Sequence, residues 1–237
     1  MLHNMTELTG ASIRATDAEL GHIEEFYFND DDWTVRYIIV DTAPLFLGRK
    51  VLISPYSVEE ISWDERVVAL NLTAHQVKKS PDIEAALPVS REHEVLLSQH
   101  YDWPHYWEGD SNCFFGTNPA ISLELQRSAE RRHRERAAEQ KERAQYAQVG
   151  ENRLRSTKEV EGYTVKANDE ELGPVKDFAI DDVSWTIRYI FVSVGSLYLS
   201  EQVLLGVDWI ESIDWHTQSI TVDLSSEQIR KAPPLEP

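Results

Sequence analysis

Histidines and aromatic rings gather in one short stretch of the chain, and their side chains are the first candidates for chemistry. The stretch runs over 100–107 and contains Trp103, His105, Tyr106 and Trp107. His100 and His105 could begin a metal site, but no carboxylate or third histidine stands at a usual ligand spacing. The rings could instead enclose a small planar ligand or pack against a protein surface. We take the four residues as interface or ligand candidates and expect no metal site.

Charged side chains surround a second candidate region. Asp30–Asp32 could hold a hard cation, but the glutamate that a calcium loop carries downstream is absent, so a solvated turn is the better interpretation. Arg36 follows among apolar residues, and Arg188 has the same setting later in the chain. We expect each arginine to face solvent or to form an internal ion pair with an acid such as Glu25 or Asp177.

No catalytic pattern is found in the sequence. It contains no glycine-rich phosphate loop, no nucleophile elbow and no His-Glu-x-x-His motif, and its 8 histidines are scattered. The single cysteine, Cys113, excludes an internal disulfide. We therefore expect no enzyme activity, no catalytic residue and no cofactor.

The elements that must position these side chains occur twice, because the chain repeats itself at an offset of 152 residues. The match runs without a gap from Gly10 to Pro81, and its clearest pairs are Leu20-Gly21 with Leu172-Gly173, Trp33–Val40 with Trp185–Val192, and Trp63 with Trp215. Such a match indicates the tandem duplication of a unit of about 75 residues. It predicts a first domain at 1–81, a connector at 82–159 and a second domain at 160–237.

Each unit is predicted to consist mainly of strands. Residues 33–40 are rich in β-branched and aromatic residues, and further strand candidates lie at 20–28, 51–53, 58–63 and 67–72. The apolar positions of 20–28 change parity, which indicates a bulge. Thr73 and Pro81 bound a short predicted helix as N-cap and stop. The predicted fold is mainly β, with two small closed antiparallel barrels in tandem and a partly helical connector.

The repeated pattern resembles the PRC-barrel domain. Its signature is a glycine, a tryptophan, an arginine and a tyrosine in each copy, namely Gly21, Trp33, Arg36 and Tyr37, and then Gly173, Trp185, Arg188 and Tyr189. The resemblance implies a non-catalytic barrel that docks onto protein partners, as in the cytoplasmic barrel of the photosynthetic reaction-centre H subunit and in bacterial two-barrel proteins. The quinone chemistry of that complex implies no role for any residue of this chain.

The connector combines a helix with a charged segment. A helix is predicted to begin after Ser90, and Arg127–Arg143 interleaves arginines with glutamates as in a solvated helix or a disordered linker. A nucleic-acid arm is conceivable there, but the glutamates nearly cancel the arginines.

The net charge of −18 opposes binding to nucleic acids and to anionic membranes. No apolar run approaches the roughly 20 residues of a membrane span, and no signal-peptide pattern opens the sequence, so we expect a cytoplasmic protein. These features favour a protein–protein interaction or assembly module, a scaffold or adaptor that binds a protein partner or self-associates. The alternative is a small-ligand-binding or sensor protein that uses the aromatic connector, linked by resemblance to photosynthetic or electron-transport complexes.

Overall fold

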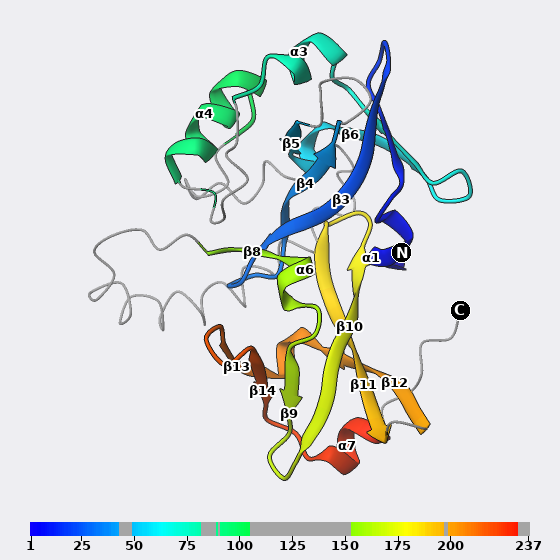
Figure 1. Ribbon diagram of the computed structural model, residues 1–237, viewed down its shortest axis with the longest axis vertical. Coiled ribbons are helices and arrows are strands. Elements are labelled where there is room, and N and C mark those ends of the chain that lie inside the picture. Colours follow the sequence, from blue (N-terminus) through cyan, green and yellow to red (C-terminus); the bar gives the residue numbers. More distant parts are fainter. Residues whose placement is uncertain (43–48, 82–88, 90, 105–152, 197–198, 232–237) are drawn as a thin grey trace, which may run out of the picture. The chain divides into compact units, whose positions relative to one another are not determined.

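The computed structural model of the protein describes residues 1–42, 49–81, 89, 91–104, 153–196 and 199–231 (Figure 1). It is mainly β, as predicted. The chain divides into two compact units, of which one combines residues 1–88 with 153–237 and the other comprises residues 89–152. Both copies of the repeat belong to the first unit, and the described part of the second holds helix α4 (Arg91–Tyr101). None of the helices in these described ranges is long and apolar enough to cross a membrane.

The two repeats consist of equivalent elements in the same order. Repeat one contains β1 (Leu2–Asn4), α1 (Met5–Leu8), β2 (Ser12–Arg14), β3 (Glu19–Asn29), β4 (Val35–Asp41), β5 (Lys50–Ile53), the 3-10 helix η1 (Pro55–Ser57), β6 (Val58–Ser62), β7 (Val67–Leu70) and α3 (Ala74–Lys78). Repeat two contains β8 (Leu154–Ser156), α6 (Thr157–Val160), β9 (Thr164–Lys166), β10 (Glu171–Asp181), β11 (Thr186–Ser196), β12 (Leu199–Gly206), the 3-10 helix η3 (Val207–Trp209), β13 (Ile210–Asp214), β14 (Ser219–Val222) and α7 (Ser226–Arg230). The structural equivalence of the repeats thus extends to β1 and β8, which precede the matched stretch that begins at Gly10 in repeat one.

Each repeat forms one mixed sheet. The strand order is β5-β4-β3-β2-β7-β6 in repeat one and β12-β11-β10-β9-β14-β13 in repeat two. The prediction of purely antiparallel strands is wrong at one ladder in each sheet, because β2 runs parallel to β7 and β9 runs parallel to β14. The cause is the 3-10 helix between β5 and β6, which joins these strands without reversing the chain direction.

Closure of the sheets into barrels stays a prediction. No ladder joins β5 to β6, or β12 to β13, among the residues that the structure describes. The hydrogen-bonded path of each sheet therefore has two ends, which lie on either side of the 3-10 helix.

The duplicated glycine is explained by a close approach of two strands. A Cβ added at Gly21 would lie 1.9 Å from the carbonyl oxygen of Asp41, and one added at Gly173 would lie 2.0 Å from that of Ser193. Any side chain would push β3 away from β4, or β10 away from β11. The predicted bulge also lies on β3, where the register with β4 shifts after Ile23.

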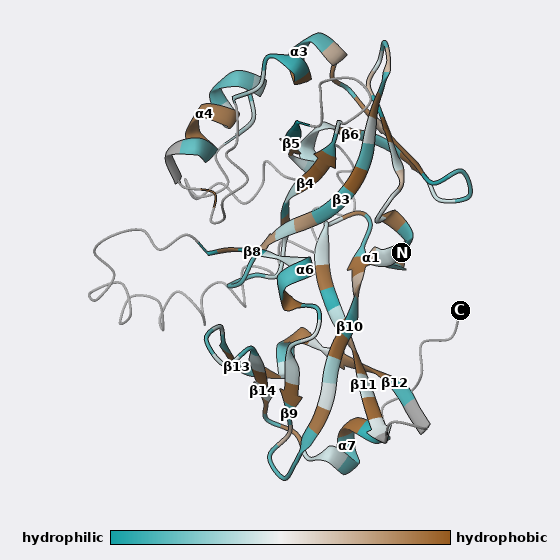
Figure 2. Cartoon of the chain, in the orientation of Figure 1, coloured by the Kyte–Doolittle hydropathy of each residue, from teal (hydrophilic) through white to brown (hydrophobic). Residues whose placement is uncertain are grey.

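Apolar side chains fill the sheets of both repeats. In Figure 2 apolar residues recur along β3, β4, β10 and β11. Ile38 and Val40 of β4 are fully buried, as are Ile190 and Val192 of β11. These strands therefore form the centre of the two cores, where burial of apolar side chains is the main driving force for folding.

A short helix closes each repeat, as the sequence predicts. The Thr73 side chain accepts a hydrogen bond from the backbone N–H of Gln76, whose side chain accepts one from the N–H of Thr73. Ser225 and Gln228 form the same capping box in repeat two. The local signal of an N-cap residue followed three positions later by glutamine sets where both helices begin.

Candidate functional site

The N-terminal segment of each repeat belongs to the sheet of the other repeat. Strand β1 pairs with β10, where Leu2 faces Asp181, and β8 pairs with β3, where Leu154 faces Asn29. Figure 1 accordingly shows α1 beside β10 and α6 beside β3. Each repeat therefore supplies a strand and a short helix to its neighbour, and neither sheet is complete without the other repeat.

A local two-fold axis relates the repeats. Thr34 forms an isolated antiparallel bridge with Thr186, its own equivalent at the offset of 152 residues. The N–H of Val35 donates to the carbonyl of Trp185 at 2.8 Å, and the equivalent bond from repeat two to repeat one has the same length. Because equivalent groups contact one another reciprocally, the repeats meet as the subunits of a two-fold dimer do.

The two signature tryptophans hold this contact through their backbone. Trp33 has a φ of 56° and Trp185 a φ of 52°, in a region that bulky residues seldom adopt. Their carbonyls accept the bonds that cross the axis, and their rings are buried. The sequence predicts Trp33 as the first residue of a strand, but β4 begins only at Val35. Each tryptophan thus has a strained backbone at the position where its carbonyl accepts a hydrogen bond from the other repeat.

A planar cation fastens β8 to repeat one. The guanidinium of Arg155 lies 4.2 Å from the ring centroid of Trp215 in its own repeat, and its Nε donates to Asp30 Oδ2 of repeat one at 2.9 Å. The cation–π contact and the charge-assisted hydrogen bond together bind the crossing strand on both sides. Burial raises the pKa of Asp30 and outweighs the opposite effect of Arg155.

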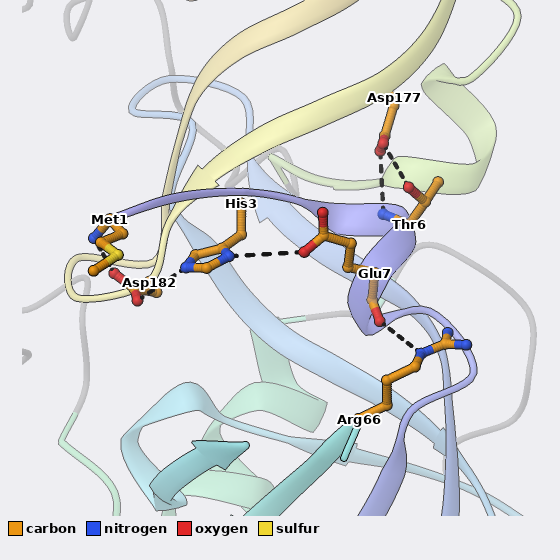
Figure 3. Close-up of polar contacts among 7 residues, drawn as sticks. All are labelled: Met1, His3, Thr6, Glu7, Arg66, Asp177 and Asp182. Atoms are coloured by element: carbon orange, nitrogen blue, oxygen red, sulfur yellow. Dashed lines mark hydrogen bonds and ion pairs between the residues drawn. The ribbon is translucent and has the colours of Figure 1, made fainter. Parts of the chain in front are cut away.

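His3 occupies the equivalent place on β1. Its ring stacks on Trp63 with centroids 3.6 Å apart and an interplanar angle of 5°. Its Nε2 lies 3.4 Å from Asp182 Oδ2 of repeat two, and its Nδ1 lies 3.7 Å from Glu7 Oε2 (Figure 3). We call these two arrangements, Arg155 with Trp215 and Asp30, and His3 with Trp63 and Asp182, the cross-repeat clamps.

A carboxylate of the opposite repeat binds each crossing helix, and the one that binds α1, Asp177, is buried. Asp177 accepts hydrogen bonds from the backbone N–H of Thr6 at 3.2 Å and from its hydroxyl at 2.7 Å (Figure 3). Burial raises the pKa of Asp177, although these bonds and one from the N–H of Phe178 act in the opposite direction. Its equivalent, Glu25, accepts a hydrogen bond from the Ser156 hydroxyl at the start of α6.

The acidic turn lies where the sequence predicts it, with Asp31 and Asp32 exposed, whereas the two signature arginines differ from each other. Asp30–Asp32 is an ion-paired turn, whose acids contact Arg155, Arg153 and Arg36 respectively. Arg36 therefore does form an ion pair, but with Asp32 of its own turn and not with Glu25, which is engaged by the other repeat. Arg188 forms no ion pair with any residue that the structure describes, because Ser184 stands where repeat one has Asp32.

The aromatic stretch of the connector is described only in part. Trp103 is buried and stacks on Tyr101 with centroids 4.2 Å apart. The other three candidates, His105, Tyr106 and Trp107, lie outside the described residues. Within the described ranges, no three His, Cys, Asp or Glu side chains form a group that could hold a metal ion.

The crossing segments were not predicted as a site. The one available signal was the offset itself, which aligns His3 with Arg155, Trp63 with Trp215 and Asp30 with Asp182. No protein-family model matches this chain, and no curated protein is significantly similar to it. The arrangement of the two repeats and their clamps is therefore the basis for the function that we propose.

Proposed function

We propose that this chain is a non-catalytic protein–protein interaction module, a scaffold in which two PRC-barrel-like repeats form one fixed pair. The exchange of N-terminal segments carries this proposal. Two tandem domains that worked independently would need only a linker, whereas here β1, α1, β8 and α6 each contact the opposite repeat. A fixed pair presents two related surfaces in a constant geometry, which suits the docking of protein partners.

The charge of the molecule supports the same role. The net charge of −18 gives the protein a strongly negative field, which accelerates encounters with basic partner surfaces and disfavours acidic ones. Closure of each sheet into a barrel, and membership of the PRC-barrel family, are parts of this proposal.

Affinity capture from a lysate of the source organism tests the proposal. The bait is the tagged full chain, and the control bait is an unrelated protein of similar size and net charge, which removes partners held by charge alone. We expect a small set of proteins that the chain enriches over the control at physiological salt. Identical captured sets, together with a strictly monomeric chain in light scattering, would overturn the proposal.

A further inference from the structure

Repeat two exposes two aromatic side chains at positions that are buried in repeat one. Tyr189 on β11 is 37% exposed and Trp209 at the end of η3 is 53% exposed. The equivalent residues of repeat one, Tyr37 and Ser57, are 3% and 1% exposed. The duplication thus provides an internal comparison, in which the same place in the fold is covered in one copy and open in the other.

The two exposed rings, which we call the aromatic pair, both lie against Gly206. A Cβ added there would be 3.4 Å from Cδ1 of Trp209 and 3.8 Å from Cε1 of Tyr189. The two ring carbons are therefore no more than roughly 7 Å apart, so that one planar group can contact both rings. The glycine leaves this space without a side chain.

Uncompensated negative charge surrounds the aromatic pair. Residues 160–237 contain 14 acidic and 5 basic side chains. Asp208 directly precedes Trp209, and Glu211 follows two positions later; both are exposed. Neither is ion-paired with a residue that the structure describes. A cation placed on these rings would therefore gain from the charge as well as from the ring faces.

We infer that the aromatic pair binds an arginine side chain of a protein partner. The inference rests on the proposed function and adds the chemistry of the partner. A guanidinium is planar, always charged and weakly hydrated, so it stacks on aromatic faces better than the compact ammonium of lysine. The same molecule already holds Arg155 against Trp215 at 4.2 Å in this way.

The binding of a defined peptide tests the inference in the full chain. The probe is a short acetylated and amidated peptide of alternating glycine and arginine, titrated while the indole N–H signals of the 7 tryptophans are followed by NMR. The Trp209 signal is identified by its loss in Trp209→Phe. We expect it to shift with a saturable concentration dependence. The peptide in which citrulline replaces arginine keeps the planar shape without the charge, and it should shift this signal far less.

Substitutions at the aromatic pair provide the decisive comparison. Trp209→Ala and Tyr189→Ala should each weaken peptide binding by about fivefold, the loss of one exposed cation–π contact. Gly206→Leu should weaken it as well, because the new side chain fills the space against both rings. Tyr56→Ala is the matched control, since Tyr56 is an exposed aromatic residue of repeat one, 46% exposed, and should leave binding unchanged. Unchanged thermal unfolding shows that a variant has retained its fold.

Three outcomes would overturn the inference. The citrulline peptide could bind equally well, the Trp209 and Tyr189 variants could retain full affinity, or Tyr56→Ala could reduce affinity as much as they do.

The lysate capture separates this inference from the proposed function. Partners that Trp209→Ala still captures in full would contradict the arginine site and leave the scaffold role standing. Specific peptide binding without any captured partner would support the site and contradict the scaffold role.

Discussion

At the scale of single residues, the two clamps show that equivalent positions can carry different residue types and still join the two repeats. His3 and Arg155 are both planar, both lie on a tryptophan of their own repeat, and both approach an aspartate of the opposite repeat. Arginine is always charged, whereas the imidazole of histidine carries N–H groups on both nitrogens only when it is protonated. The arginine clamp therefore contains a permanent cation, whose Nε donates a hydrogen bond to Asp30 at 2.9 Å.

Arg155→Ala should lower the free energy of unfolding by about 1–3 kcal/mol. The substitution removes a charge-assisted hydrogen bond and a cation–π contact, and it leaves the partly buried carboxylate of Asp30 without its main partner. Urea denaturation measures the change. The control is Arg153→Ala, whose exposed pair with Asp31 should contribute no more than about 0.5 kcal/mol. Equal losses in the two variants would contradict the role of the clamp.

His3→Arg should raise the stability at neutral pH by roughly 0.5–1 kcal/mol. The new guanidinium would lie on Trp63 and pair with Asp182, as Arg155 does with Trp215 and Asp30. His22→Arg adds the same charge on an exposed part of β3 and controls for the general benefit of a cation in an acidic protein. A gain in His22→Arg as large as in His3→Arg would show that charge alone is responsible.

Asp177→Asn should leave stability unchanged at low pH and raise it at neutral pH, by about 1 kcal/mol, because the hydrogen bonds from Thr6 and Phe178 offset part of the cost of burying the charge. The amide keeps an acceptor for the N–H groups of Thr6 and Phe178 and can donate to the Thr6 hydroxyl. Burial holds the pKa of Asp177 above its ordinary value, so the ionised form opposes folding. The loss of folding stability caused by the ionised Asp177 is absent below the unfolded-state pKa and grows as pH rises through the folded-state pKa.

Unfolding curves at several pH values from about 2 to 8 measure this dependence, because both expected changes begin at or below the ordinary aspartate pKa, and Asp181→Asn provides a control of opposite sign. Burial opposes ionisation of Asp181, but hydrogen bonds from Ser184 and Val183 outweigh it and lower its pKa. The ionised Asp181 therefore stabilises the fold, and this contribution is lost as pH falls through the folded-state pKa. A stability loss in Asp177→Asn that increases with pH would contradict the assigned direction.

At the scale of elements, the strands that the sequence predicts best are those whose signals are local. The predicted spans 20–28, 51–53 and 58–63 correspond closely to β3, β5 and β6, because apolar patterning is visible within each strand. The capping box of α3 is equally local. The parallel ladders and the exchanged strands depend on partners far away in the chain, and no pattern within β1 or β8 reveals such a partner. His3 and Arg155 also hide their equivalence, because their residue types differ.

Gly173→Ala should be strongly destabilising, by about 1–3 kcal/mol or more. The added methyl group would overlap the Ser193 carbonyl at 2.0 Å and force β10 away from β11. Gly206→Ala is the matched control, since its Cβ would make an ordinary 3.4 Å contact with Trp209. Thermal unfolding compares the two variants, and an equally small effect in both would show that the approach of β10 and β11 does not require glycine.

At the scale of the whole molecule, the described contacts that join the repeats lie in the sequence on either side of residues 89–152. The exchanged strands, the clamps and the bridge between Thr34 and Thr186 all belong to residues 1–42, 49–81 and 153–231. The unit that contains both repeats accordingly excludes residues 89–152. Covalent continuity between the repeats should therefore be unnecessary once the chain has folded.

Cleavage of the folded chain within the connector tests this independence. A protease recognition sequence inserted at Gly116 allows the purified protein to be cut once, in a part of the sequence that lies outside the described residues. We expect the two pieces to elute together in size-exclusion chromatography at micromolar concentration and to separate only in denaturant, because each piece completes the sheet of the other. The same cut in a protein that also carries Arg155→Ala should lower the denaturant concentration at which the pieces separate. Pieces that separate in native buffer would show that the connector, and not the exchanged segments, holds the repeats together.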